Sequence, residues 1–188
     1  MRRLIISCLI FVSVTCAQEY KLGSKVTGFA VQDLSGAPVS FGSLGAVTVV
    51  TFISTQCPVS NTYNDRMSAV YKTYSAKGVK FVFVNANRNE SADEVAEHAK
   101  SVGFPFTVYK DPNNELADRF DAQVTPESYV LDSEGKLVYR GQVDDNRNQA
   151  RVHQQSLRMA LDAVLAGKPV PVAETKAFGC SIKRARRT

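Results

Sequence analysis

Cysteine and histidine are scarce in this sequence, and their scarcity excludes two classes of protein. The chain has four cysteines and two histidines, without the short spacing that zinc ligands show. We therefore predict no metal site and no cofactor. Cys8 and Cys16 precede Ala17, so a chain cut after Ala17 keeps Cys57 and Cys180, which are too few for a disulfide-rich scaffold.

A long hydrophobic run is also missing. The apolar stretch Leu4–Val14 is too short to span a bilayer comfortably. It follows two arginines and precedes small residues that end at Ala17, an arrangement typical of a secretory signal. We predict that residues 1–17 are a signal peptide cleaved after Ala17, and that the mature protein is secreted or periplasmic with no membrane span. The alternatives are an uncleaved anchor or a lipid on Cys16.

The body of the chain has no strong excess of charge. The net charge is +5, but several basic residues lie at the two ends of the chain: Arg2, Arg3, Arg184, Arg186 and Arg187. The body has no basic stripe with interleaved aromatic residues, so we predict no nucleic-acid partner. The basic tail is predicted to be a solvated end.

The first half of the chain predicts a hairpin, a strand and a helix. The turn motif DLSGAP joins apolar stretches at Phe29–Val31 and Val39–Phe41, which indicates a β-hairpin. The β-branched run Ala46–Ile53 predicts a central strand covered on both faces. Helical periodicity begins after Pro58 and ends at Gly78.

The second half continues this alternation. Val79–Val84 predicts a strand, and a capping box formed by Ser91 and Glu94 starts a helix. Asp144–Asn148 is interpreted as the cap of a later helix whose buried face begins at Val152. The other predicted elements are an extended segment at Phe104–Tyr109, a short helix after Asp111, and a hairpin of Glu127–Asp132 and Lys136–Arg140. Strand–helix–strand units imply parallel pairing and the late hairpin adds antiparallel strands, so we predict an α/β fold with helices on both faces of a mixed sheet.

Cys57 lies between the central strand and the following helix, and Pro58 suits the first helical position. A helix start has unpaired backbone N–H groups and the positive end of the helix dipole, and both favour thiolate over thiol. We therefore expect the pKa of Cys57 to lie below the free value of about 8.5. Thiolate is the nucleophile in disulfide exchange and in peroxide reduction. The alternative is a buried structural cysteine.

Three stretches carry a family resemblance: GSKVTGFAVQDLSGAPVSF, TFISTQCP and DPNNELADRFDAQVTPESYVLDSEGKLVYRG. From about Leu22 to Leu165, the chain resembles the thioredoxin-like superfamily. It is most similar to the redoxin and peroxiredoxin-like branch (alkyl hydroperoxide reductase/thiol-specific antioxidant). We expect residues 18–170 to form this domain, and residues 171–188 to form an extension with Cys180 and the basic tail.

The resemblance also implies that Pro126 follows a cis peptide bond and packs against the reactive cysteine. The residues agree, because Val124-Thr125-Pro126 directly precedes a predicted strand, where a trans proline would disturb pairing. An ordinary trans turn proline is the alternative. If the likeness holds, the Thr125 backbone offers hydrogen bonds to the extended chain of a partner.

Three positions depart from the family patterns. Ser60 stands where a Cys-x-x-Cys site has its second cysteine. The peroxiredoxin pattern has a proline and a threonine where this chain has Val50 and Ser54, although a hydroxyl at Ser54 is still able to orient a peroxide or the thiolate. The strand before Cys57 carries no carboxylate, so the buried acid of the thioredoxins has no predicted counterpart.

Because of Ser60, Cys57 has no neighbouring thiol in the sequence to resolve its adducts. Cys180, a small thiol or a partner protein must do so. Ser60 either donates a hydrogen bond to the Cys57 thiolate, lowering its pKa, or faces solvent. Phe178 and Ile182 suggest a tail that docks, and Cys180 remains open as a resolving thiol, an intermolecular bridge, a structural disulfide or a spare thiol.

We therefore predict a thiol-based oxidoreductase in which Cys57 attacks a disulfide. The first alternative is a peroxiredoxin-like peroxidase, an antioxidant enzyme with Cys57 peroxidatic and Cys180 resolving. The second is a non-enzymatic binding module of thioredoxin fold. The predicted partners are thiol- or disulfide-containing proteins, small thiols or hydroperoxides. The predicted substrate-binding residues are Ser54, Pro58, Ser60, Thr125 and Pro126.

Overall fold

The structure is a computed structural model that describes residues 19–42 and 45–185. The predicted signal peptide, residues 1–17, lies outside the described residues. In the described ranges, no helix combines the length and the apolar character that crossing a membrane requires.

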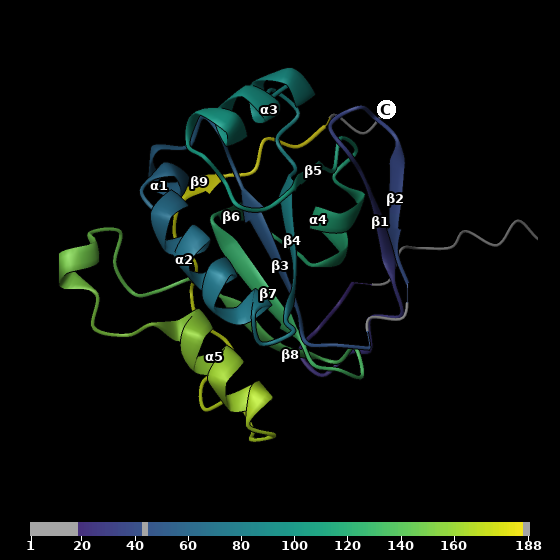
Figure 1. Ribbon diagram of the computed structural model, residues 1–188. Helices are drawn as coiled ribbons and strands as arrows, with labels where there is room; N and C mark the ends of the chain where they lie inside the picture. The colour runs from purple at the N-terminus through teal and green to yellow at the C-terminus, as the bar shows by residue number, and fades with distance from the viewer. Residues whose placement is uncertain (1–18, 43–44, 186–188) are drawn as a thin grey trace, which may run out of the picture.

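A mixed sheet of seven strands forms the centre of the molecule, in the order β2-β1-β5-β4-β3-β7-β8 (Figure 1). Its strands are β1 (Phe29–Gln32), β2 (Pro38–Phe41), β3 (Thr48–Ile53), β4 (Lys80–Asn85), β5 (Val108–Lys110), β7 (Glu127–Leu131) and β8 (Leu137–Gly141). β4 is parallel to β3 and β5, whereas β7 runs antiparallel to both β3 and β8. The strands predicted from the sequence are thus confirmed, together with the mixed pairing.

β3 lies inside the sheet between β4 and β7, and every one of its residues is buried. Alternate side chains point to opposite faces of a strand. Val49 and Ile53 accordingly join the apolar cluster on one face, whereas Val50 and Phe52 join the cluster on the other. This two-sided burial explains the continuous β-branched run, and it places the end of the strand, just before Cys57, on rigid support.

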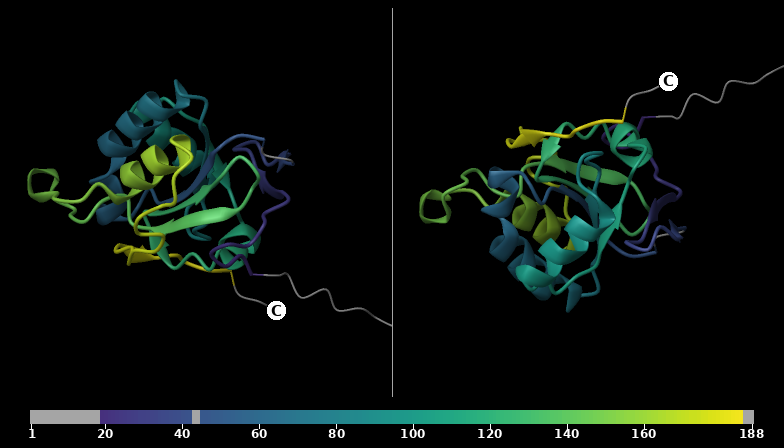
Figure 2. Two further views of the ribbon diagram at one scale, coloured as in Figure 1. Left: turned by 90° about the horizontal axis from the view of Figure 1, so that it is seen from below. Right: turned by 90° about the horizontal axis from the view of Figure 1, so that it is seen from above.

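Helices cover both faces of the sheet (Figure 2). They are α1 (Pro58–Asn61), α2 (Asn64–Ser75), α3 (Ala92–Ser101), α4 (Glu115–Arg119), α5 (Ser156–Leu165) and a 3-10 turn, η1 (Gln149–Arg151). Residues of α2, α3 and α5 build the apolar cluster on one face, and α4 packs on the other face against Tyr20 and Phe29. The predicted placement of helices on both sides is confirmed.

The helix predicted from Pro58 to Gly78 is interrupted after its first turn. α1 ends at Asn61 and α2 begins at Asn64. The Thr62 hydroxyl donates to the carbonyl of Val59 at 2.8 Å. Short polar side chains that bond to nearby backbone groups compete with a continued helix. The predicted helical periodicity is therefore confirmed, whereas the prediction of one continuous helix was wrong.

The helix predicted around Val152 begins later, at Ser156. Asn148 caps η1 rather than a long helix, since its side chain accepts from the backbone N–H of Ala150 at 3.0 Å. Asp144, interpreted as part of the cap, is instead 4% exposed and ion-paired with Arg66 at 2.7 Å. The polar run is therefore a loop anchored by a buried ion pair.

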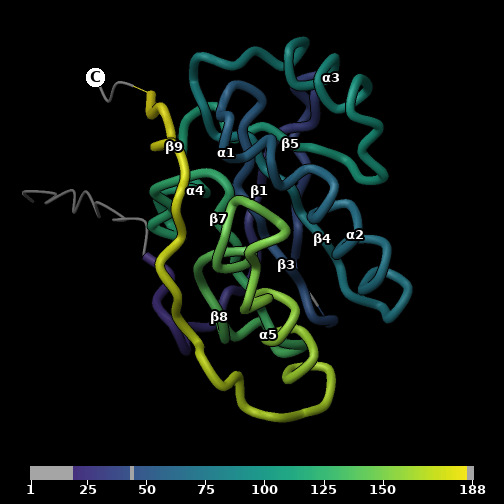
Figure 3. Tube along the Cα trace, turned by 90° about the vertical axis from the view of Figure 1, so that its left-hand side faces the viewer, coloured from purple at the N-terminus to yellow at the C-terminus, as the bar shows by residue number. Residues whose placement is uncertain are grey.

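After α5 the chain returns along one edge of the body (Figure 3). The backbone N–H of Thr175 donates to Arg140 of β8, and the N–H of Arg140 donates to Ala173. Farther along, β9 (Cys180–Ser181) pairs antiparallel with β6 (Val124–Thr125) in a separate two-stranded sheet. The C-terminal segment thereby reaches the end of the sheet where Cys57 lies.

Candidate active site

Cys57 is the N-cap residue of α1, with Pro58 in the first turn. The backbone N–H of Ser60 donates to the Cys57 sulfur at 3.3 Å. The sulfur therefore meets an unpaired donor of the helix start, as the sequence predicted. Cys57 is also 3% exposed, so the thiol is covered rather than open to solvent.

The Thr125–Pro126 segment lies against Cys57. The Thr125–Pro126 peptide bond is cis, as predicted. The Cys57 sulfur lies 3.4 Å from the carbonyl oxygen of Thr125, to which the thiol donates a hydrogen bond. Two segments that are far apart in the sequence therefore meet at one sulfur atom.

Cys180 reaches the same place from the C-terminal segment. On β9 it stands opposite Thr125 in the register of the β6–β9 pair. The Cys180 side chain thereby comes close to Cys57, whose thiol donates to the Thr125 carbonyl, and both residues are free thiols. Phe178 packs edge-on against Tyr63 with ring centroids 6.3 Å apart, and Ile182 is buried. The expectation that these two residues dock the tail is met.

The pKa values of the two thiols are shifted in opposite directions. Burial raises the pKa of Cys57, but hydrogen bonds from the Cys180 side chain and the Ser60 N–H outweigh burial, so the pKa lies below its ordinary value. The pKa of Cys180 is raised, first by its hydrogen bond to Cys57 and then by burial. Cys57 is therefore the member of the pair that ionises first.

Ser60 and Ser54 hold the Cys57 loop rather than face solvent. Ser60 is completely buried, and its hydroxyl oxygen accepts from the backbone N–H of Ser54 at 3.1 Å. The hydroxyl oxygen of Ser54 in turn accepts from the N–H of Cys57 at 3.0 Å. The contact of Ser60 with the Cys57 sulfur runs through its backbone N–H, and its hydroxyl supports the loop.

A buried carboxylate, Glu90, lies beneath this loop. Glu90 is 3% exposed and follows β4 on the way to α3. Its oxygens accept from the hydroxyl of Ser54 at 2.5 Å, from the N–H of Thr55 at 2.7 Å and from the Asn85 amide at 2.5 Å. The strand before Cys57 carries no carboxylate, as the sequence indicated, and Glu90 instead comes from a different loop, which was not identified from the sequence.

Hydrogen bonds keep Glu90 ionised. Burial raises the pKa of its carboxyl, but hydrogen bonds from Ser54, Thr55 and Asn85 outweigh burial and hold the pKa below its ordinary value. The Lys110 ammonium completes the network, donating to the Asn85 side chain at 2.7 Å and to the Glu90 carbonyl at 2.6 Å. The charge of Glu90 is therefore compensated inside the protein and fixes the loop that carries Cys57.

The sequence did contain a signal for Glu90. Residues at the carboxyl ends of neighbouring parallel strands gather at one edge of an α/β sheet. β3 leads to Cys57 and β4 leads to Glu90, and the two strands are parallel neighbours. Glu90 immediately precedes the Ser91 capping box, whose carboxylate partner is Glu94, so it looked like an ordinary loop residue.

The structure brings together all seven residues predicted for the site. Cys57, Pro58 and Ser60 belong to the start of α1, and Ser54 accepts from Cys57. Thr125, Pro126 and Cys180 approach from the opposite side. In the described part of the chain, no group of three or more His, Cys, Asp or Glu side chains is placed to hold a metal ion.

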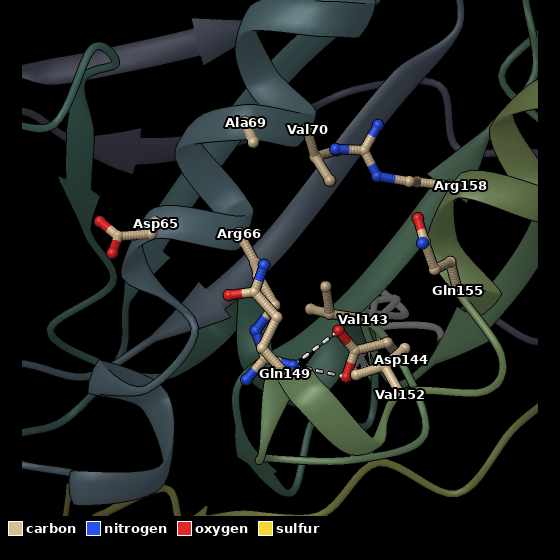
Figure 4. Close-up of a pocket in the computed structure, with 10 residues that line it drawn as sticks. All are labelled: Asp65, Arg66, Ala69, Val70, Val143, Asp144, Gln149, Val152, Gln155 and Arg158. Carbon is tan, nitrogen blue, oxygen red and sulfur yellow. Dashed lines mark hydrogen bonds and ion pairs between the residues drawn. The ribbon is translucent and has the colours of Figure 1, made fainter.

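A separate cavity of about 600 Å³ lies between α2 and the loop before α5 (Figure 4). Arg66 and Asp144 meet at its lining, and the Tyr63 hydroxyl donates to Asp144 at 3.0 Å. Neither Cys57 nor Cys180 lines this cavity. The buried ion pair fixes the loop before α5, and the cavity is not part of the thiol site.

The sheet order, the cysteine at a helix start, the adjacent cis proline and the second thiol define a thiol-based oxidoreductase of the thioredoxin-like class. A family model described as the AhpC/TSA family matches residues 22–140. The chain therefore belongs to the AhpC/TSA family, and the predicted redoxin resemblance is confirmed.

Known proteins agree with this assignment. The chain is 27% identical to the thiol-disulfide oxidoreductase ResA of Bacillus subtilis over 151 residues, which cover 73% of this chain and 83% of that protein. Among solved structures, it is similar to an uncharacterized conserved protein from Geobacillus kaustophilus (TM-score 0.81, 34% identity, 90% of this chain and 95% of that chain). A hypothetical protein from Sinorhizobium meliloti 1021 is also similar (TM-score 0.79, 30% identity, 89% and 97% of the two chains).

Proposed function

We propose that this protein exchanges disulfides through the pair Cys57 and Cys180. The observation that carries the proposal is that Cys180 stands opposite Thr125, whose carbonyl accepts from the Cys57 thiol, while the Ser60 N–H at the helix start donates to the Cys57 sulfur. The pKa is lowered at Cys57 and raised at Cys180. Such an arrangement separates a nucleophile from a resolving thiol.

The proposed reaction has two steps. The Cys57 thiolate attacks a substrate disulfide, forms a mixed disulfide and expels one substrate thiolate. The Cys180 thiol, once deprotonated, attacks the Cys57 sulfur, forms the Cys57–Cys180 disulfide and releases the second substrate thiol. Two electrons pass from the protein to the substrate, and an external thiol must reduce the new disulfide. Cys180 thus takes the role of the second cysteine of a Cys-x-x-Cys site, whose position is occupied here by Ser60.

The other site residues position the nucleophile in this proposal. Ser54 fixes the Cys57 backbone, and Ser60 donates to the sulfur through its N–H. Pro58 starts the helix without needing a hydrogen-bond partner. Thr125, with Pro126, supplies backbone contacts beside the sulfur.

Trapping of the mixed disulfide tests this proposal. With a disulfide-bearing peptide as substrate, we expect Cys180→Ser to accumulate an adduct on Cys57, because resolution is blocked, and the unaltered chain to accumulate a Cys57–Cys180 disulfide. Cys57→Ser should lower the exchange rate by at least about 100-fold, because the nucleophile is gone. Peptide mass spectrometry without reducing agent reads both products. An adduct on Cys180 in the unaltered chain would refute the assigned roles.

Peroxide reduction is the second candidate, favoured by the Ser54 hydroxyl beside Cys57 in a member of the AhpC/TSA family. In that reaction the Cys57 thiolate attacks the peroxide O–O bond, becomes a sulfenic acid and releases an alcohol or water. The sulfenic acid then condenses with the Cys180 thiol to form the Cys57–Cys180 disulfide and releases water. Disulfide exchange has the stronger support, because the Ser54 hydroxyl is already bonded to Glu90 and to the Cys57 N–H. Hydroperoxide consumption by the reduced chain, compared with Cys57→Ser, distinguishes the two.

We also propose that residues 1–17 are a cleaved signal and that the mature protein acts outside the cytoplasm. An apolar run flanked by arginines and by Ala17 supports this proposal. A protein that cycles between dithiol and disulfide is suited to an oxidising compartment. Mass spectrometry of the protein from its native host should find Gln18 as the first residue, and an intact Met1–Ala17 segment would contradict cleavage.

A further inference from the structure

The C-terminal segment occupies a strand edge beside the nucleophile. β6 has no strand partner other than β9 among the described residues. Val124 pairs with Ser181, Thr125 pairs with Cys180, and the N–H of Ile182 donates to the carbonyl of Gln123 at 3.0 Å. Without β9 this edge of β6 would be unpaired, and an unpaired strand edge is a template for an extended chain.

The segment approaches the β6 backbone so closely that only glycine fits at one position. A Cβ added at Gly179 would collide with the carbonyl oxygen of Thr125. The backbone conformation at Gly179 has no positive φ, so the requirement is close approach and not backbone freedom. The position before Cys180 is therefore specified by the surface of β6.

Positions after Cys180 are specified as well. The Ile182 side chain is 7% exposed, within the apolar cluster that contains Ala122 and Phe120. The Arg184 guanidinium forms an ion pair with Asp118 at 2.5 Å and also donates to the carbonyl of Ala122. The prediction of a solvated tail was therefore wrong for Arg184, whereas residues 186–188 lie outside the described ranges.

The same segment covers the nucleophile. Cys57 is 3% exposed, and the Cys180 side chain takes part in its hydrogen bonding. A substrate disulfide must bring one sulfur against Cys57 in order to be attacked. That position is taken by Cys180, so a protein substrate and the C-terminal segment compete for the same place.

The resemblance already implies that the Thr125 backbone bonds to the extended chain of a partner. We propose that residues 179–184 of this chain fill that β6 edge as an internal competitor, which keeps Cys57 covered until β9 leaves β6. This inference rests on the proposed function, in which Cys57 reacts with the disulfide of a substrate. The site selects glycine before the cysteine, an aliphatic residue two places after it and a basic residue four places after it. A partner segment docks when β9 leaves β6, with its cysteine opposite Thr125 and against Cys57.

Local release of β9 is physically reasonable. β9 is a two-residue strand, and short segments of this kind open at a fraction of the cost of global unfolding. A tethered segment competes at a high effective concentration, in the millimolar range for a short flexible tether. A free partner therefore gains access mainly when the tethered segment is weakened.

Selective labelling of Cys57 tests the covering role in the full chain. The background is Cys180→Ser, and the readout is the rate of labelling at Cys57 by iodoacetamide and by the larger fluorescein maleimide, quantified on the Cys57 peptide. We expect Gly179→Ala to raise the ratio of the large-probe rate to the small-probe rate about tenfold, because β9 is displaced. Gly42→Ala is the matched control, since a Cβ there meets no atom within 4 Å, and it should leave the ratio unchanged.

A second variant and a second measurement cover the remaining outcomes. Arg184→Ala removes one anchor without forcing a collision, and should raise the ratio less than Gly179→Ala does. A labelled peptide that copies residues 177–185, with serine in place of Cys180, should bind Gly179→Ala but not the parent or Gly42→Ala. Replacing its isoleucine by aspartate should abolish binding. An unchanged labelling ratio in both variants overturns the covering role, and faster labelling without peptide binding overturns the competition for the β6 edge.

These measurements are independent of turnover. Labelling and peptide binding report on access to Cys57 and to β6, whether or not the chain exchanges disulfides. A chain that shows displaced β9 and peptide binding but forms no mixed disulfide would contradict the proposed function and leave the internal competitor supported. If the parent and Gly179→Ala exchange disulfides at equal rates and the labelling ratio is unchanged, the proposed function stands and the inference about the C-terminal segment is contradicted.

Discussion

Cys57 and Cys180 are neighbours in space, yet they belong to regions built in different ways. Cys57 follows a fully buried strand and sits on a loop tied to a buried carboxylate, Glu90. Cys180 belongs to a two-residue strand held by a glycine contact, one apolar side chain and one partly exposed ion pair. The first region is part of the core, and the second is docked onto it.

This difference matches the two roles in a dithiol reaction. A nucleophile benefits from a fixed environment that favours its thiolate, because each donor must stay in place when charge develops. A resolving thiol must reach the nucleophile and also make room for a substrate. The opposite pKa shifts of the two thiols follow from the same hydrogen bond, which favours ionisation of Cys57 at the expense of Cys180.

The largest effect is expected from a substitution in the core region that supports Cys57. Glu90→Gln should lower the free energy of unfolding by about 2–4 kcal/mol, because an amide NH2 would replace an acceptor that faces several donors. It should also change the pH profile of Cys57 alkylation, since the loop bonded to Ser54 and Thr55 would loosen. Urea denaturation and alkylation kinetics measure the two effects.

Asp144→Asn is the matched control. Asp144 is an equally buried carboxylate, ion-paired with Arg66. Its hydrogen bonds run to Tyr63, Arg66 and Asn146, whereas those of Glu90 run to the Ser54–Thr55 loop before Cys57. We expect a similar loss of stability and an unchanged alkylation profile. Equal profiles for Glu90→Gln and Asp144→Asn would show that Glu90 has only a structural role.

Acidification gives a second check on Glu90. Its pKa in the folded protein is lowered, so its contribution to stability is fully present above the unfolded pKa of about 4.3 and is lost as the pH falls through the folded pKa. The stability gap between the parent and Glu90→Gln should therefore shrink with acidification below that unfolded value. A gap that stays constant down to strongly acidic pH would show that the folded protein does not hold Glu90 ionised.

A smaller effect is expected from removing the Cys180 thiol, which favours ionisation of Cys57 from the C-terminal segment. Cys180→Ala removes the hydrogen bond that favours the Cys57 thiolate, so the midpoint of Cys57 alkylation against pH should rise. Cys180→Ser keeps a hydroxyl donor and should restore part of the shift. The sign is decisive, because a midpoint that falls in Cys180→Ala would mean that removing the cover over Cys57 outweighs the lost hydrogen bond.

The smallest effect is expected on the docked side. Asp118→Asn removes the charge that pairs with Arg184, and both side chains are partly exposed. Such pairs are worth about 0–1 kcal/mol, so global stability should hardly change. Hydrogen exchange at the Ile182 N–H, which donates to Gln123, should nevertheless become faster. If hydrogen exchange at Ile182 does not change while the free energy of unfolding falls by several kcal/mol, the C-terminal segment is part of the core and is not docked onto it.

Two residues that the sequence identified share one property, which is a strong local signal. Cys57 lies between a β-branched run and Pro58, and Pro126 directly precedes a strand. The signals at Cys57 and Pro126 are visible within a few residues, so the main strands and this part of the thiol site were predictable before the structure. Cys180 stood out only as the other cysteine after Ala17.

The residues that were missed or misjudged depend on distant partners. Glu90 gains its importance only because β4 lies beside β3. Arg184 was predicted to be solvated because Asp118 is remote in the sequence. The break after Asn61 is the local exception, since the Thr62 hydroxyl bonds to a backbone group next to it.

By itself, the sequence determined the alternation of strands and helices, the position of Cys57 at a helix start and the likeness to redoxins, because apolar periodicity, proline and capping residues act over a few positions. Only the tertiary structure decided which thiol Cys57 meets, which carboxylate supports its loop and which segment fills the β6 edge. Those outcomes depend on strand order and on the path of the C-terminal segment, which bring together residues that no local pattern connects.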